Sequence, residues 1–231
     1  MHQDVAATNS TSLLPEKIPV DVFKGSGCGF VWDAESVKTL REEHRIVGSL
    51  CGSIARFPLQ HVFMGLPLQL SPEEITLLFH RGIISLIDSH KSYQPEEDKG
   101  ETATHSGSTL TLPTSSVKLP YYRPQSLQEE ATKKIMEICD HNRYVVFEVL
   151  WSMGYYIGPG LKFGGDYLLY EGDPLRYHAA KIASVVEWNE EFCLRELVAR
   201  ARLAGGAKKT HWMCAGLAGD VHIFEIKWAG F

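Results

Sequence analysis

The sequence predicts an α+β protein in which a small N-terminal α/β domain is joined by a linker to a larger C-terminal domain with a mixed sheet. Segments 20–88 and 126–231 both combine apolar residues at helical spacing with short apolar runs typical of strands. Residues 89–125 change to Ser, Thr, Pro, Glu and Gly with almost no aliphatic periodicity, which predicts a disordered linker. In the second segment helices precede strands, an order typical of α+β folds. Residues 1–19 are polar, and we expect them to be flexible.

The N-terminal domain is expected to combine strands with two capped helices. Asp33 can cap the first helix through its side chain. Ser71 and Pro72, followed by two glutamates, favour the start of the second helix, because proline fits the first turn and acids suit its positive end. Gly82 should end that helix. The expected helices are 34–44 and 72–80, and the expected strands are 30–32, 46–52 and 83–87.

The C-terminal domain is expected to begin with two helices and to continue with strands. The second helix has apolar residues at helical spacing, although its segment 144–147 would also suit a strand. A Gly-Pro-Gly turn at 158–160 should separate these helices from the first strand. The expected helices are 126–138, 143–153 and 194–204, and the expected strands are 166–170, 181–187, 210–215 and 221–228.

Charge is unevenly distributed along the chain. The net charge of −5 argues against a general binder of polyanions. Residues 1–142 carry 13 Lys and Arg against 18 Asp and Glu, whereas residues 143–231 carry ten of each sign. One segment of the second part opposes five cations with only Glu196. These cations are Arg195, Arg200, Arg202, Lys208 and Lys209. Such a strip fits a specific phosphate contact, and a solvated helix face explains the charge pattern equally well.

Composition and the first residues predict an intracellular protein without membrane insertion. The chain has 231 residues, of which 44% are hydrophobic and 22% charged, as in ordinary globular proteins. Its five cysteines form no Cys-x-x-Cys pair, which argues against a disulfide framework and against a zinc site. The first residues lack the features of a signal peptide, and no apolar run approaches the ~20 residues that cross a bilayer.

Three side chains with complementary chemistry follow one another in the C-terminal domain. Tyr170 ends an expected strand, His178 follows the Gly-Asp-Pro turn at 172–174, and Lys209 follows the basic helix. A phenol, an imidazole and an ammonium can take a proton, give a proton and hold negative charge. Cleavage of RNA through its own 2′-hydroxyl requires these three abilities and no metal ligand.

Each of these residues also has an ordinary structural explanation. A tyrosine at a strand end is usually a packing residue, and Tyr167, which alternates with it, is expected in the core. Most histidines are structural or exposed, and Lys209 beside Lys208 suits a solvated helix end. Together with a rigid turn that fixes their geometry, the three residues favour catalysis. Pro174 is expected to open a short helix that places His178 just over one turn from its start.

Residues 154–178, together with the Lys-Lys-Thr step at 208–210, resemble the catalytic core of the tRNA-splicing endonuclease family. The resemblance covers 143–231 almost continuously and implies a nuclease domain of the tRNA-intron endonuclease type. In the first domain, segments 31–35 and 65–74 resemble the eukaryotic subunit that cuts the 3′ splice site, and not its 5′-cutting paralogue.

The resemblance implies a role for each candidate residue. Tyr170 would be the general base on the 2′-hydroxyl, His178 the general acid on the leaving 5′-oxygen, and Lys209 the stabiliser of the charged phosphate. The products would be a 2′,3′-cyclic phosphate and a 5′-hydroxyl, formed without a metal or a cofactor. Arg202 and Trp228 match the arginine and tryptophan with which family members hold an unpaired intron base.

The resemblance also implies partners and a location. The chain would be a lyase that acts on intron-containing precursor tRNA in the nucleus, within a heterotetramer whose small structural subunit pairs with strand 221–228. A non-catalytic RNA-binding or scaffold subunit of the same complex is the main alternative. A metal-dependent nuclease is a further alternative, for which Asp166 and Asp173 are the nearby carboxylates but form no convincing ligand set.

Overall fold

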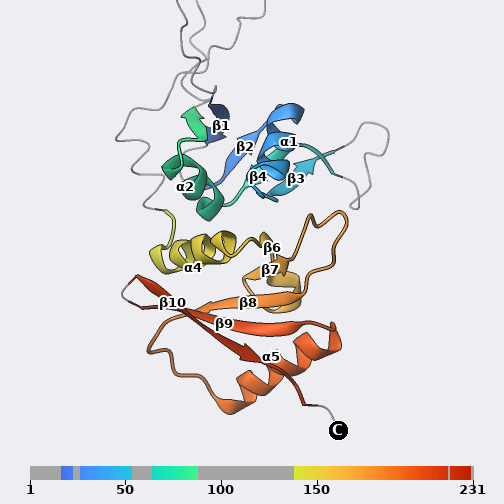
Figure 1. Ribbon diagram of the computed structural model, residues 1–231, viewed down its shortest axis with the longest axis vertical. Helices are drawn as coiled ribbons and strands as arrows, with labels where there is room; N and C mark the ends of the chain where they lie inside the picture. The colour runs from blue at the N-terminus through green and yellow to red at the C-terminus, as the bar shows by residue number, and fades with distance from the viewer. Residues whose placement is uncertain (1–16, 23–26, 54–63, 88–137, 218, 230–231) are drawn as a thin grey trace, which may run out of the picture.

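The computed structural model describes residues 17–22, 27–53, 64–87, 138–217 and 219–229. It confirms the α+β class, with an N-terminal and a C-terminal domain that are stacked along the long axis of the molecule (Figure 1). The expected linker 89–125, nearly all of the expected helix 126–138 and most of segment 1–19 lie outside the described residues.

The N-terminal domain is a five-stranded sheet with two helices. The strand order is β3-β4-β2-β1-β5, in which β1 and β5 are parallel and the other neighbours are antiparallel. The strands are β1 (Ile18–Val22), β2 (Gly29–Val31), β3 (Ser49–Gly52), β4 (Gly65–Leu70) and β5 (Ile84–Ile87), and the helices are α1 (Ala34–Glu42) and α2 (Pro72–His80).

Both helices of this domain begin at the predicted capping residues. The Asp33 carboxylate accepts a hydrogen bond from the backbone N–H of Ser36 at 2.7 Å. The Ser71 hydroxyl accepts from the N–H of Glu74 at 3.2 Å, and the Glu74 carboxylate accepts from the N–H of Ser71 at 2.8 Å. This reciprocal pair is a capping box, which fixes the start of α2.

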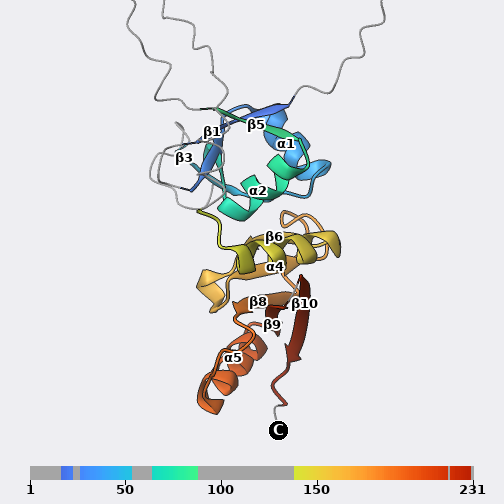
Figure 2. The ribbon, with the colours of Figure 1, turned by 90° about the vertical axis from the view of Figure 1, so that its left-hand side faces the viewer.

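The C-terminal domain is a five-stranded sheet between two helices. Its order is β10-β9-β8-β7-β6, and only β8 and β9 are parallel. Helix α4 lies on the side of the sheet that faces the N-terminal domain, and α5 lies on the opposite side (Figure 2). The strands are β6 (Tyr156–Pro159), β7 (Tyr167–Tyr170), β8 (Lys181–Val186), β9 (Thr210–Leu217) and β10 (Asp220–Ile226), and the helices are α4 (His141–Ser152), the 3₁₀ turn η1 (Leu161–Phe163) and α5 (Leu194–Gly206).

Alternation along β7 assigns its side chains to two different cores. Tyr167 and Leu169 belong to the large cluster beneath α4, whereas Leu168 and Tyr170 belong to a smaller cluster that contains Ala204 of α5. The expectation that Tyr167 is a core residue is therefore confirmed. Tyr170 lies on the opposite face, half-buried at the end of the strand.

The two domains share one hydrophobic core. A single cluster contains Leu77 of α2, Phe147 and Leu150 of α4, and buried residues of both sheets. A parallel bridge between Ile46 and Ile157 also joins the backbones of the two domains. The domains are therefore packed as one body over the described residues.

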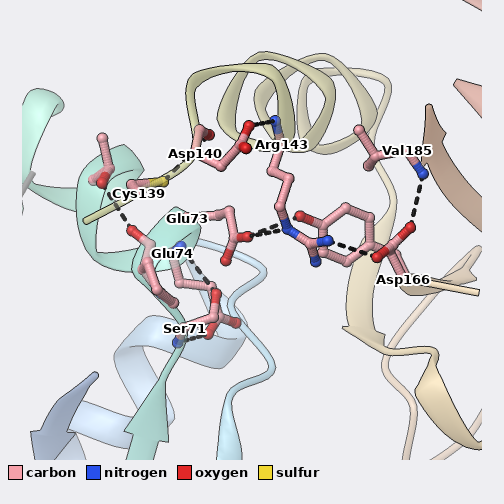
Figure 3. Close-up of polar contacts among 11 residues, drawn as sticks. Ser71, Glu73, Glu74, Cys139, Asp140, Arg143, Asp166 and Val185 are labelled. Carbon is pink, nitrogen blue, oxygen red and sulfur yellow. Dashed lines mark hydrogen bonds and ion pairs between the residues drawn. The ribbon is translucent and has the colours of Figure 1, made fainter. Parts of the chain in front are cut away.

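Arg143 of α4 forms the main polar link at this junction (Figure 3). Its Nε donates to the carboxylate of Glu73 in α2 at 3.0 Å, and its Nη1 donates to Asp166, just before β7, at 2.6 Å. The second oxygen of Asp166 accepts from the N–H of Val185 in β8 at 2.8 Å. One guanidinium thereby ties α2, α4 and the start of β7 together.

Some expected elements differ from those observed. Residues 158–160 were expected to form only a turn, yet 156–159 form β6, because they pair with all of β7. The helix expected to start at Pro174 is absent. The carbonyl of Asp173 accepts from the N–H groups of Arg176 and Tyr177, which gives a single turn, and the chain then continues in irregular conformation to β8 at Lys181. Strand β10 ends at Ile226, so Trp228 lies beyond it.

His211 in β9 gives the fold a measurable dependence on pH. Its side chain is only 1% exposed, its Nε2 has no hydrogen-bond partner among the described residues, and burial lowers its pKa to about 4. An unfolded chain with the ordinary pKa of 6.5 binds a proton that the folded protein excludes. The contribution of His211 to the free energy of unfolding should thus be constant well above pH 6.5 and fall between pH 6.5 and about pH 4, by up to about 1.4 kcal/mol per pH unit.

Denaturant unfolding of His211→Gln at several pH values checks this expectation. The variant should lose part of the acid dependence of the wild type, whereas His222→Gln, at an exposed position on β10, should keep it. An unchanged slope in His211→Gln would contradict the assignment.

Candidate active site

Tyr170 is held at the end of β7 by a close approach to β6. A Cβ atom added to Gly158 would lie 3.3 Å from the Cε2 atom of the Tyr170 ring and 3.9 Å from its hydroxyl. The glycine therefore leaves room for the ring on this face of the sheet. Burial raises the pKa of the Tyr170 phenol above its ordinary value of 10.0, so at neutral pH the side chain is a neutral hydrogen-bonding group.

His178 follows a compact turn organised by Asp173. One carboxylate oxygen of Asp173 accepts from the N–H of Leu175 at 2.8 Å, in addition to the two bonds made by its backbone carbonyl. A Cβ atom at Gly172 would lie 2.6 Å from the Tyr177 ring, so glycine is needed where this ring lies against the turn. The His178 side chain itself is exposed.

Lys209 turns inward after α5, and its neighbour turns outward. The Nζ atom of Lys209 donates to the carbonyl of Ala179 at 2.9 Å and lies 5.7 Å from the centre of the Phe163 ring. Lys208 has a φ of 54° and an exposed side chain. The positive φ redirects the chain between α5 and β9, and this places Lys209, not Lys208, against the segment that follows His178.

Residues 179–180 bring the three candidate residues into one region. The N–H of Ala180 donates to the carbonyl of Leu169, which precedes Tyr170, at 2.9 Å. The carbonyl of Ala180 accepts from the N–H of Thr210, which follows Lys209, at 3.2 Å. His178 is two residues earlier on this segment. The segment is therefore bonded on one side to the strand of Tyr170 and on the other to the strand that follows Lys209.

Arg202 and Trp228 also lie together. The guanidinium carbon of Arg202 in α5 is 5.6 Å from the centre of the Trp228 ring. Both side chains are exposed, Trp228 to 47%. This cation–π contact is accessible from solvent, and such contacts at exposed sites contribute only about 0.5–1 kcal/mol.

Two protein-family models match this chain. The family model described as "TSEN34-like, N-terminal domain" matches residues 20–89, and the one described as "tRNA intron endonuclease, catalytic C-terminal domain" matches residues 141–222. Together the two models match more than half of the chain. The chain belongs to the tRNA-splicing endonuclease family.

Its relatives within this family include complete Sen34 subunits. The Schizosaccharomyces pombe protein named "Probable tRNA-splicing endonuclease subunit sen34" is 28% identical, over 94% of this chain and 99% of that protein. The human "tRNA-splicing endonuclease subunit Sen34" is 25% identical, over 88% of this chain and 97% of that protein. A "tRNA-splicing endonuclease" of Methanopyrus kandleri is 38% identical over 29% of this chain and 37% of that protein.

An ion pair between the two domains was not indicated by the sequence. Asp173 was considered only as a carboxylate for a metal, but it is bonded to Arg41 of α1, 132 residues earlier. The residues around Arg41 and around Asp173 form no pattern that predicts a contact between positions 132 residues apart. No group of three or more His, Cys, Asp or Glu side chains among the described residues is placed to hold a metal ion.

The domain junction contains a cavity that is separate from the candidate residues. A cavity of about 270 Å³ at the domain junction is lined by Glu73, Arg143 and Tyr167 among others, and none of the five candidate residues contributes to it. It therefore belongs to the domain junction and not to the site of Tyr170. Of the helices in the described ranges, none is both long and apolar enough to cross a membrane.

Proposed function

We propose that the chain is the catalytic subunit of a nuclear tRNA-splicing endonuclease that cuts precursor tRNA at the 3′ splice site. The products are a 2′,3′-cyclic phosphate and a 5′-hydroxyl. The observation that carries this proposal is the segment 179–180, which is bonded both to the strand of Tyr170 and to the strand that follows Lys209. The strand of Tyr170 and the strand that follows Lys209 thereby meet at the segment that comes directly after His178.

In the proposed reaction, the 2′-hydroxyl of the RNA attacks the adjacent phosphorus. Tyr170, in its phenolate form, takes the proton of this hydroxyl as the 2′-oxygen bonds to phosphorus, and becomes a neutral phenol. The bond from phosphorus to the 5′-oxygen breaks, and His178 gives a proton to that leaving oxygen. No water enters the step, so the phosphate remains as a cyclic diester.

In this proposal Lys209 holds the negative charge of the reacting phosphate. An ammonium has three donors, so Nζ can keep its bond to the carbonyl of Ala179 and still donate to a phosphate oxygen. Tyr170 needs help to act as a base, because burial raises the pKa of its phenol. If the Lys209 ammonium moves toward the phenol when RNA binds, its positive charge would lower this pKa.

The choice of splice site rests on the N-terminal domain and on the relatives. That domain matches the TSEN34-like description, and the relatives that span the full chain are named Sen34 subunits. Specificity for the 3′ site, intron-containing precursor tRNA as substrate, the heterotetramer and a nuclear location follow from the family resemblance, and they form part of this proposal.

Substitution of His178 tests the catalytic role directly. In the assembled endonuclease, His178→Ala should bind precursor tRNA normally and cleave it about 10²–10⁴ times more slowly, the usual share of a positioned acid. Lys209→Met should also slow the 3′ cut, whereas Lys208→Met, at the exposed neighbour, should cleave like the wild type. Rates and product ends are measured by gel analysis of labelled RNA with EDTA present.

Two results would overturn the proposal. Wild-type cleavage by His178→Ala would favour a non-catalytic RNA-binding or scaffold subunit. Loss of all wild-type activity in EDTA would favour a metal-dependent nuclease.

Arg202 and Trp228 are proposed to hold an unpaired intron base between them. A base stacked on such a pair contributes about 1–3 kcal/mol, which exceeds the cation–π contact that it would replace. The family resemblance assigns this clamp to the active site across the assembly. Arg202→Ala should thus change the stability of the fold by no more than about 1 kcal/mol, the upper value for an exposed cation–π contact, and weaken cleavage at the partner's splice site.

Melting temperature and site-resolved cleavage decide this point together. Trp228→Ala should give the same selective defect. A large loss of stability with equal losses at both splice sites would make Arg202 a structural residue.

Strand β10 is proposed to pair with the small structural subunit. It is the edge strand of its sheet, and Phe224 on its outer face is 55% exposed, while Val221 and Ile223 pack against the protein's own core. An exposed edge with an apolar side chain is suited to sheet extension across an interface.

A negative charge at position 224 should disrupt the proposed interface between β10 and the small subunit. Phe224→Asp should abolish co-purification with the small subunit while the chain stays folded by circular dichroism. Leu161→Asp, at a position that is 87% exposed and outside β10, should co-purify normally. Normal binding by Phe224→Asp would exclude this face as the interface.

A further inference from the structure

Arg41 reaches from the N-terminal domain to the turn that precedes His178. Its Nε donates to the two carboxylate oxygens of Asp173 at 2.9 and 3.1 Å, and its Nη2 donates to one of them at 2.8 Å. The pair is partly buried, with 21% of the Arg41 side chain and 28% of the Asp173 side chain exposed. Such a forked bond fixes direction as well as distance, which a lysine at the same place would not do.

Asp173 is the residue on which the turn depends. Its side chain accepts from the N–H of Leu175, and its carbonyl accepts from the N–H groups of Arg176 and Tyr177 at 2.8 and 2.9 Å. All three donors lie between Asp173 and His178. A change in the orientation of Asp173 therefore changes the path of the chain up to His178.

Few other contacts constrain the position of His178 in the described residues. Its side chain is exposed, and the turn before it forms no helix. On the other side, the position of the backbone is set from Ala179 onward by the bonds to Lys209, Leu169 and Thr210. The Arg41 bond fixes the remaining end of this loop.

Arg41 is itself attached to a rigid support. Just beyond α1, the carbonyl of His44 accepts from Nε1 of Trp151 at 2.8 Å, and Arg45 donates to the carbonyl of Trp151 at 3.1 Å. Arg45 also lies over the Trp151 ring, 4.6 Å from its centre. The end of α1 is thus bound to α4, and Arg41 extends from this fixed point.

We propose that Arg41 is a positioning residue for RNA cleavage: through Asp173, the N-terminal domain sets the conformation of the loop that presents His178 to the leaving oxygen. The inference rests on the proposed function and adds a role for the first domain within it. Arg41 also neutralises the Asp173 carboxylate, whose pKa is lowered chiefly by this bond.

The alternative is that the ion pair only docks the two domains. Arg45 provides a matched control, because it also joins the N-terminal domain to α4 but does not touch the loop. Since Arg45 has a φ of 55°, Asn is the suitable replacement, as it tolerates this backbone conformation. A docking role predicts equal effects at both arginines, and a positioning role predicts a difference.

Single-turnover cleavage by the assembled endonuclease, with precursor tRNA bound at saturation, tests the proposal. Arg41→Ala and Asp173→Asn should each lower the rate about 10- to 100-fold with unchanged Kd for the RNA, because small misplacements of a catalytic group have costs of this size. The double variant should be no slower than the slower single variant, since both remove the same contact. Arg41→Lys should recover part of the rate, and Arg45→Asn should cleave like the wild type.

The results that would contradict the role of Arg41 can be distinguished from those that would contradict the proposed function. Wild-type rates for Arg41→Ala, multiplicative losses in the double variant, or an equal loss of rate in Arg45→Asn would overturn the positioning role. His178→Ala is measured beside them. If it cleaves normally, the proposed function fails, whereas a defective His178→Ala beside a normal Arg41→Ala refutes only the role of Arg41.

Discussion

The guanidinium of Arg143 links the two domains at their junction. It bonds Glu73 of the first domain and Asp166 of the second at once, and Asp166 in turn accepts from the backbone of β8. Strand β7 is only four residues long, so an anchor at its start also determines where its last residue, Tyr170, lies. An interaction in the domain junction therefore reaches the candidate active site on the other face of the sheet.

Local sequence signals predicted those parts of the fold that depend on local chemistry. Asp33 and Ser71 mark helix starts because their side chains bond to N–H groups three residues later. Alternation along β7 separated Tyr167, which is in the core, from the tyrosine three residues later, because successive side chains point to opposite faces. Sequence patterns also predicted that Tyr170 ends a strand and that Lys209 follows a helix, and the family resemblance supplied the roles of these residues.

Long-range bonds account for what the sequence did not predict. The helix expected to start at Pro174 and to include His178 is absent. Instead, the backbone of Ala180 forms hydrogen bonds with Leu169 and Thr210, which belong to two other strands. Strand β6 was not expected because a Gly-Pro-Gly segment usually signals a turn, and only pairing with β7 extends it. The Arg41–Asp173 bond spans 132 residues, and the raised pKa of Tyr170 comes from burial. Neither feature has a local signature.

The central claim is that Tyr170, His178 and Lys209 act on one phosphate of precursor tRNA. Electron cryomicroscopy of the assembled endonuclease, bound to precursor tRNA with a 2′-deoxynucleotide at the 3′ splice site, tests it most directly. We expect the scissile 5′-oxygen to lie about 2.6–3.2 Å from a ring nitrogen of His178, with Lys209 on a phosphate oxygen and the Tyr170 hydroxyl facing the 2′ carbon. A scissile phosphate bound elsewhere, or three side chains directed at different groups, would contradict the account.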